Sequence, residues 1–184
     1  GYSGFEVGLS MHTVATQDIG YYGSRTTVDR NLIYPLINIG KGIFDNMDLL
    51  FSFLPFNEST GVGIYSGALR WAFYHATFVP ASFSLLVSGG STNLNNLFYS
   101  QTTGADLVTS VNVDPFSFYV GAGVLYGQAQ FARTLTASQA MSNQVGRAFH
   151  TMLGMNVSIA EYFTAIEVDT YNSTVVSFKL GARL

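Results

Sequence analysis

Three histidines, His12, His75 and His150, are the residues of this sequence with the widest range of possible chemistry. A metal site needs several His, Cys or carboxylate ligands at close and regular spacing, and none of the three histidines has such a neighbour. The chain contains no cysteine, which excludes a disulfide framework, a thiolate metal site and a cysteine nucleophile. The sequence therefore predicts no metal site and no cofactor.

Enzymatic chemistry is not indicated, although one enzyme class stays open. A serine esterase needs Ser, His and carboxylate side chains that converge in the fold, and no local signature groups them here. Residues 121–127 (GAGVLYG) are similar to a nucleotide-binding glycine loop, but the last glycine comes one residue too late and no helical pattern follows. We expect no catalytic residues and keep a lipid-modifying barrel enzyme as a second alternative.

The charge content is unusual for a soluble protein. Asp, Glu, Lys and Arg make up 10% of the chain, against about 25% in typical globular domains. Apolar residues make up 48%, so a soluble fold would have too little polar surface to cover itself. The net charge is -3 and no cluster of Lys and Arg occurs, which argues against binding to nucleic acid.

The elements that must position these residues are strands, because apolar residues alternate with small or polar ones along most of the chain. The pattern predicts one all-β domain over residues 1–184, with ten antiparallel strands in up-and-down order, or eight as the alternative. Tight links follow the even strands, whereas the long links, residues 15–31 and 132–143, follow odd ones. The expected strands cover residues 2–14, 32–43, 47–56, 62–77, 82–88, 97–113, 116–131, 144–158, 163–171 and 175–184.

The two faces of these strands differ in a way that indicates a membrane barrel. One face carries mainly Gly, Ala and Ser together with most of the charged residues, and the other carries Phe, Val, Leu, Ile and Tyr. Small and polar residues suit the interior of a narrow barrel, and an apolar outer face suits lipid. Because strands cross a bilayer only as a closed barrel, we predict a closed antiparallel transmembrane β-barrel. The alternative is a soluble barrel with its apolar side chains inside.

Two stretches resemble small bacterial outer-membrane β-barrels, the broad class that includes the transmembrane domain of outer-membrane protein A. Residues 41–51 (KGIFDNMDLLF) resemble a strand, periplasmic turn and strand of such proteins. The C-terminal segment resembles their assembly signal, in which alternate residues are apolar and the last is usually aromatic; the matching residues here are Val176, Phe178, Leu180, Ala182 and Leu184. The resemblance implies a bacterial outer membrane containing lipopolysaccharide, insertion by the barrel-assembly machinery, and chain ends in the periplasm.

Charged residues on the small-residue face are expected to pair across the interior. The short links predict that Glu167 lies opposite Lys179 and that Asp48 lies opposite Arg70. Such pairs either close a narrow barrel or line a pore. The other polar residues expected to point inward are Glu6, His12, Asp106, His150 and Asp169, and the larger ones are Leu50, Leu54, Leu86, Tyr74, Tyr119 and Leu125.

The function predicted from these features is structural. Polar loops on a rigid scaffold are where binding usually occurs, and residues 15–31 carry Tyr21, Tyr22 and Arg25 as candidate contacts. We therefore expect a scaffold or partner-binding subunit, with a protein partner at the loops or at the periplasmic end. A narrow channel for ions or small solutes is the first alternative.

Overall fold

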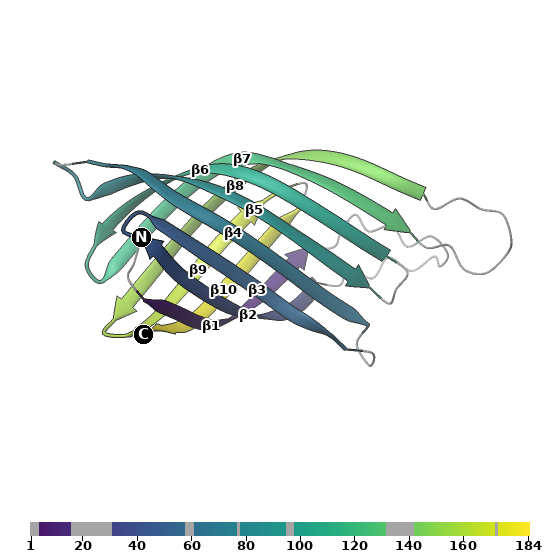
Figure 1. Cartoon of the computed structure of the whole chain (residues 1–184), viewed down its shortest axis with the longest axis horizontal. Helices are drawn as coiled ribbons and strands as arrows, with labels where there is room; N and C mark the ends of the chain where they lie inside the picture. Colours follow the sequence, from purple (N-terminus) through teal and green to yellow (C-terminus); the bar gives the residue numbers. More distant parts are fainter. Residues whose placement is uncertain are drawn as a thin grey trace, which may run out of the picture.

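The computed structural model describes residues 4–15, 31–57, 61–76, 78–94, 98–131, 142–171 and 173–184. These residues form ten antiparallel strands that close into a barrel, which confirms the predicted fold (Figure 1). None of them forms a helix that is long and apolar enough to cross a bilayer. The strands are β1 (Phe5–Ala15), β2 (Asn31–Phe44), β3 (Met47–Asn57), β4 (Val62–His75), β5 (Ala81–Leu94), β6 (Phe98–Val113), β7 (Phe116–Phe131), β8 (Ser142–Ile159), β9 (Tyr162–Thr170) and β10 (Thr174–Arg183).

The topology is up-and-down, because each strand pairs with its neighbours in sequence and the barrel closes where β1 pairs with β10. At this seam the backbone N–H of Phe5 donates to the carbonyl of Leu184 at 2.9 Å, and the N–H of Leu184 donates to the carbonyl of Phe5 at 2.7 Å. The start of β1 and the end of β10 therefore lie together, at the end of the barrel that carries the tight turns (Figure 1).

Short turns set the register of several hairpins, since a hairpin with a short loop leaves its strands little freedom to slide. Residues 45–46 join β2 to β3, residues 114–115 join β6 to β7, and residues 160–161 join β8 to β9, at the positions that the sequence predicted. The fifth strand is longer than predicted and runs to Leu94. Gly89 and Gly90 do not end it, because both pair with β4 on one side and with β6 on the other.

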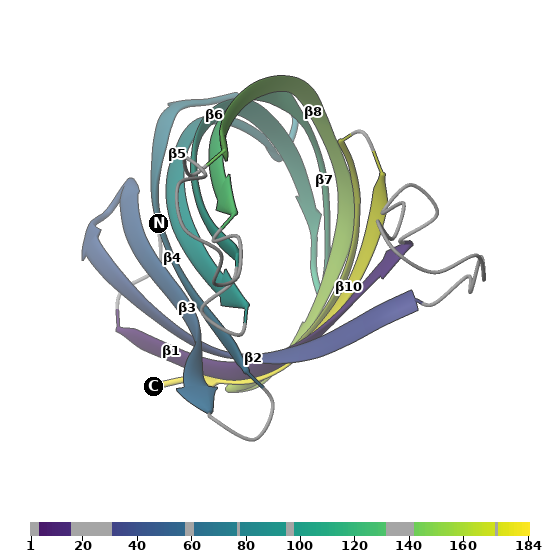
Figure 2. The same ribbon diagram turned by 90° about the vertical axis from the view of Figure 1, so that its right-hand side faces the viewer.

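The alternation of the sequence separates an apolar outside from a polar inside. Large apolar side chains cover the outer face, where Leu9 is 63% exposed and Phe149 is 66% exposed. The strands enclose an interior space (Figure 2). The residues that alternate with the apolar ones belong to the inner face, where Glu6 and Asp106 are 5% and 4% exposed. The barrel therefore has most of its strand charges inside and most of its large hydrophobic residues outside, as the sequence predicted.

Glycines on the inner face make room for large side chains of neighbouring strands. A Cβ atom at Gly154 on β8 would overlap the ring of Tyr119 on β7. A Cβ atom at Gly181 on β10 would lie 2.6 Å from the ring of Phe163 on β9. At these two positions an aromatic ring of the neighbouring strand occupies the space that the glycine leaves, so the glycines allow close packing of the interior.

A bulge near the end of β4 changes the direction of one predicted inward residue. The register between β4 and β5 shifts between Ala72 and Tyr74, so that Tyr74 lies opposite Phe83 on the outer face. Tyr74 is 54% exposed, and its ring centroid lies 5.8 Å from that of Phe83. The prediction that Tyr74 points inward is therefore wrong, because an extra residue in one strand breaks the alternation of faces.

Candidate functional site

The polar interior is the candidate functional site, and Asp48 and Arg70 form its first ion pair. The two residues are partners in the β3–β4 ladder, as the sequence predicted. Arg70 Nε donates to Asp48 Oδ2 at 2.8 Å, and Arg70 Nη2 contacts the same oxygen. The Asp48 side chain is 1% exposed, whereas the Arg70 side chain is 42% exposed, so the arginine links a buried carboxylate to a wetter part of the interior.

The second predicted pair, Glu167 with Lys179, is wrong. Glu167 lies opposite Ser177, and Lys179 lies opposite Ala165. The β9–β10 ladder begins at Thr170 and Thr174, so the register differs from the predicted one by two residues. A shift of two leaves every side chain on its predicted face and changes only its partner.

Lys179 instead binds Glu6 across the seam of the barrel. Lys179 Nζ donates to Glu6 Oε1 at 2.5 Å, and Arg183 Nε donates to Glu6 Oε2 at 3.1 Å. The ring of Phe163 lies beneath both cations, with its centroid 5.2 Å from Lys179 Nζ and 4.8 Å from Arg183 Cζ. One buried carboxylate therefore holds two cations over an aromatic face, and this cluster joins β1, β9 and β10.

A second cluster places His150 between two carboxylates. His150 Nδ1 lies 2.7 Å from Asp106 Oδ1, and His150 Nε2 lies 3.2 Å from Asp169 Oδ1. The ring of Tyr171 stacks on the imidazole, with centroids 4.3 Å apart and planes 1° apart. Gly123 lies between Asp106 and His150 in the ladder, and its lack of a side chain leaves room for the carboxylate. Both nitrogens of the His150 ring contact carboxylates, and the cluster therefore links β6, β8 and β9.

Glu167 takes part in a third contact, which spans a strand. Tyr119 Oη donates to Glu167 Oε2 at 2.6 Å, although Tyr119 is on β7 and Glu167 is on β9. The intervening residue of β8 is Gly154, which lies opposite both partners in the two ladders. The tyrosine ring crosses over the glycine, and its hydroxyl group satisfies the carboxylate that the sequence had paired with Lys179.

His12 belongs to an uncharged network on β1, β2, β3 and β10. Its Nε2 lies 2.8 Å from Ser10 Oγ and its Nδ1 lies 2.7 Å from Ser177 Oγ, while the ring stacks on Tyr34 with centroids 5.3 Å apart. Asn38 extends the network, because its Nδ2 donates to Ser10 Oγ at 2.9 Å. The hydroxyl group of a third serine then donates to Asn38 Oδ1 at 2.6 Å; this is Ser52.

The histidine contacts in these clusters differ from those of a Ser–His–carboxylate relay. A Ser–His–carboxylate relay holds the imidazole between a nucleophile on one nitrogen and a carboxylate on the other. His150 contacts carboxylates through both nitrogens, and His12 contacts serine hydroxyl groups through both. In the described part of the chain, no group of three or more His, Cys, Asp or Glu side chains is placed to hold a metal ion.

The remaining predicted residues fall into two groups. Tyr21, Tyr22 and Arg25 lie outside the described residues. The five residues of the suggested assembly signal all belong to the outer face of β10 or follow it directly, and Phe178 and Leu184 are 41% and 80% exposed; the set is Val176, Phe178, Leu180, Ala182 and Leu184.

Comparisons with known proteins give only distant similarities. No protein-family model and no curated protein matches the chain. The solved structures that resemble it include the N-terminal β-barrel domain of OprF from Pseudomonas aeruginosa, with a TM-score of 0.47, 10% sequence identity and 97% of each chain covered. Neisserial surface protein A (NspA) has a TM-score of 0.41 and 13% identity, over 100% of this chain and 99% of that chain. Ail, the attachment invasion locus protein of Yersinia pestis, has a TM-score of 0.40 and 13% identity, over 99% and 98%. Similarity at this level assigns neither a family nor an activity, so the function is argued from the surfaces of this chain.

Proposed function

We propose that this chain is an integral β-barrel of the bacterial outer membrane, and that it acts as a rigid scaffold rather than as an open channel. The observation that carries the proposal is the inverted distribution of side chains. Charged residues such as Glu6, Asp106 and Asp169 are buried inside the barrel, whereas large apolar residues such as Leu9 and Phe149 are exposed outside it.

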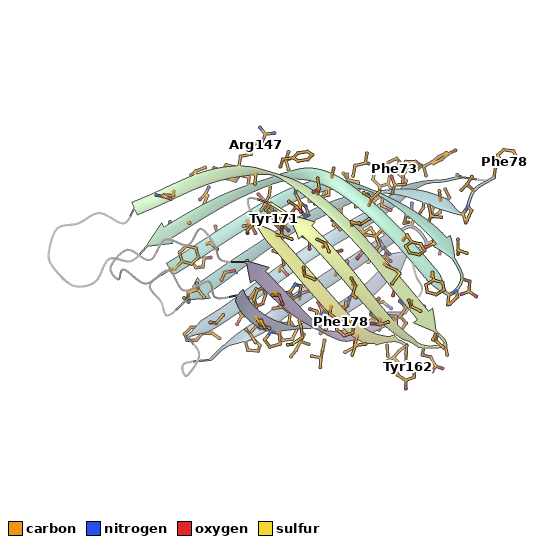
Figure 3. The ribbon with its side chains drawn as sticks, turned by 180° about the vertical axis from the view of Figure 1, so that it is seen from behind. Phe73, Phe78, Arg147, Tyr162, Tyr171 and Phe178 are labelled. Atoms are coloured by element: carbon orange, nitrogen blue, oxygen red, sulfur yellow. The ribbon has the colours of Figure 1, made fainter. Side chains whose placement is uncertain are left out.

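The outer face supports the membrane location. Soluble monomers seldom expose contiguous apolar patches larger than a few hundred Å². Here exposed apolar side chains recur around the barrel on neighbouring strands, including Phe118 on β7, Leu153 on β8 and Ile166 on β9. Each described strand pairs with a neighbour on both sides, which closes the barrel around its circumference, although residues 31–36 of β2 and 142–150 of β8 extend past the ladders to β3 and β9. Exposed aromatic residues lie towards the tight turns, as in the girdles of transmembrane barrels: Phe73 is seen there in Figure 3, and Trp71 pairs with Met47, the first residue after the turn at 45–46.

The interior supports the scaffold role. The three carboxylate clusters connect strands that are not neighbours in sequence, and each fills part of the cross-section with paired side chains. Removing one partner of such a buried pair costs about 3–5 kcal/mol, because the other charge stays buried without compensation. A network of this kind fixes the shape of the barrel, and a fixed shape is what a surface for partner binding requires.

The channel is the second candidate, and one observation favours it. The inner face of β8 near the loops carries Gly146, and a Cβ atom there would have no atom within 4 Å. Space on this side of the interior would have to continue past the Glu6 and His150 clusters to form a pore. The two functions therefore differ in whether these clusters block the passage.

The experiment is folding of the purified chain into detergent and then into planar bilayers. A heat-modifiable electrophoretic mobility is expected for a closed barrel, and a chain that is monomeric and soluble without detergent would contradict the membrane location. The scaffold role predicts no single-channel steps for the folded protein. Single-channel current steps that occur with the wild-type protein and are altered by Glu6→Ala would instead establish the channel.

The remaining features have matching roles in this proposal. The alternate apolar residues of β10, from Val176 to Leu184, would be recognised by the barrel-assembly machinery. The loops 15–31 and 132–143 would contact a protein partner. Neither role involves catalysis. Unmodified lipid A after expression of the protein, and copurification of a stoichiometric partner from native membranes, are the results expected.

A further inference from the structure

The outer face carries two shallow grooves that lie next to each other. One has a volume of about 420 Å³ and crosses β6, β7 and β8, where Thr103, Val124, Tyr126 and Arg147 line it. The other has a volume of about 360 Å³ and crosses β3, β4 and β5, beside the outward glycines Gly67 and Gly89. The ladders connect the two grooves in one cross-strand row, in the order Gly67, Gly89, Thr103, Tyr126 and Arg147.

Arg147 is an unusual residue for this surface. It is exposed and points away from the barrel (Figure 3), between the outward apolar residues Val145 and Phe149 on the same strand. It forms no hydrogen bond or ion pair with any residue that the structure describes. A guanidinium group on an apolar surface needs water or an anion, and its planar donors fit a phosphate group through two parallel hydrogen bonds.

The side chains around Arg147 change in a definite order along the barrel axis. On the side of the tight turns the outer face is apolar, with Val124 on β7 and Phe149 on β8. On the side of the loops it is mixed: exposed amide side chains lie beside the exposed Tyr99 on β6 and Val145 on β8; the amides are Gln101 on β6 and Gln128 and Gln130 on β7. Arg147 therefore lies between an apolar surface and a mixed surface in which β6 and β7 contribute the amides.

We propose that the groove over β6–β8 is a binding site for a phosphorylated glycolipid of the outer leaflet, of the lipid A type. Arg147 binds a phosphate group, an acyl chain lies along Val124 in the groove, and the neighbouring amides of Gln128 and Gln130 bind sugar hydroxyl groups. The order apolar, cationic, amide on the protein matches the order acyl chain, phosphate, sugar on the lipid. This site rests on the proposed location in the outer membrane, with the loops outside.

The test uses the full chain folded in detergent micelles, with Trp71 fluorescence as the measure of thermal unfolding. Bisphosphorylated lipid A, lipid A without its phosphates, and phosphatidylglycerol are titrated separately into the protein. We expect lipid A to raise the unfolding midpoint of the wild type more than either other lipid. Arg147→Gln should bind lipid A at least about tenfold more weakly, since it loses a charge-assisted phosphate contact.

Two further variants make the test specific to this groove. Lys41→Gln removes the outward cation of β2, whose Nζ lies 4.3 Å from the ring centroid of Phe5, and it should leave the lipid A affinity unchanged. Arg147→Lys keeps the charge but loses the planar donors, and its affinity should fall between those of wild type and Arg147→Gln.

Three results would overturn the site: wild-type affinity in Arg147→Gln, an equal loss in Lys41→Gln, or equal stabilisation by phosphatidylglycerol. A heat-modifiable mobility, measured on each variant before titration, separates this inference from the membrane location. Folded protein without lipid preference removes only the lipid site. Failure to form a detergent-stable barrel removes the proposed function as well.

Discussion

Two parts of the inner surface are built on different principles. The paired wall consists of the inward side chains of β9, β10, β1 and β2 and of residues 150–159 of β8, together with Asp106 of β6; it contains the Glu6, His150 and His12 clusters. The small-residue wall is the inner face of the loop-side halves of β4 to β8; it consists mainly of Ser66, Ala68, Ser88, Gly90, Thr92, Ser100, Thr102, Gly104, Gly127, Ala129, Gly146 and Ala148.

Ladder length separates the two walls. The β9–β10 ladder contains nine residue pairs, whereas the β6–β7 ladder contains sixteen. A long ladder holds two strands together through many backbone hydrogen bonds, while a short one offers fewer. The described ion pairs of Asp48, Asp169 and Glu6 lie across ladders of nine residue pairs, whereas the Asp106–His150 pair spans β7, whose two ladders have sixteen pairs each. Side-chain ion pairs therefore add mainly to the shorter ladders.

The largest difference between the walls is expected for Glu6→Ala. This variant leaves Lys179 and Arg183 without their carboxylate, so the free energy of unfolding should fall by about 3–5 kcal/mol. Ser88→Ala on the small-residue wall should change it by no more than about 0.5 kcal/mol. Urea unfolding in lipid vesicles, followed by Trp71 fluorescence, measures both, and equal effects would remove the distinction between the walls.

A matched pair of glycines on β8 gives the next largest contrast. Gly154→Ala puts a methyl group into the Tyr119 ring and should destabilise the barrel by about 1–3 kcal/mol. Gly146→Ala enters open space and should be within about 0.5 kcal/mol of wild type. The same unfolding measurement applies, and a costly Gly146→Ala would show that the small-residue wall is packed as tightly as the other.

A double-mutant cycle tests the corrected register. Glu6 and Lys179 should couple by about 0.5–3 kcal/mol, because they are in direct contact. Glu167 and Lys179, whose pairing was predicted from the sequence, should show the smaller coupling. Alanine variants of the three residues, singly and in pairs, supply both cycles. A larger coupling energy for Glu167 and Lys179 than for Glu6 and Lys179 would support the register that was predicted from the sequence.

The smallest effect is a difference in accessibility along β5. Ser84 and Ser88 both point inward, but Ser84 is 6% exposed, whereas Ser88 is half-buried. Since the chain contains no other thiol, Ser84→Cys and Ser88→Cys report on these positions alone. A water-soluble maleimide added from the loop side should label Ser88→Cys faster than Ser84→Cys. Faster labelling of Ser84→Cys would show that the open space lies at the end with the tight turns.

The sequence predicted the faces of the strands better than their partners. A period of two assigns each residue to the inside or the outside without any knowledge of register. Asp48 and Arg70 could also be paired, because only a short link separates β3 from β4. The bulge at Ala72 and Tyr74 escaped prediction, since no residue type marks the extra residue in that strand.

The side-chain contacts that were not predicted from the sequence join strands that no short turn connects directly. Glu6 meets Lys179 and Arg183 only because β1 and β10 close the barrel, and nothing in the sequence fixes the stagger of that closure. Tyr119 reaches Glu167 across a strand, over Gly154. The position of Gly154 opposite Glu167 could have been predicted from the sequence, because the two-residue turn between β8 and β9 fixes that register.

The seam between β1 and β10 also implies an order of events in time. Glu6 and its two cations are separated by 173 and 177 positions in the chain, the longest separations of any side-chain contact described above. Contacts of such high separation form late, because most of the chain must already be ordered before its ends can meet. The Glu6 cluster therefore forms at the end of barrel closure, because Lys179 reaches Glu6 only when strands β1 and β10 have paired in the correct stagger.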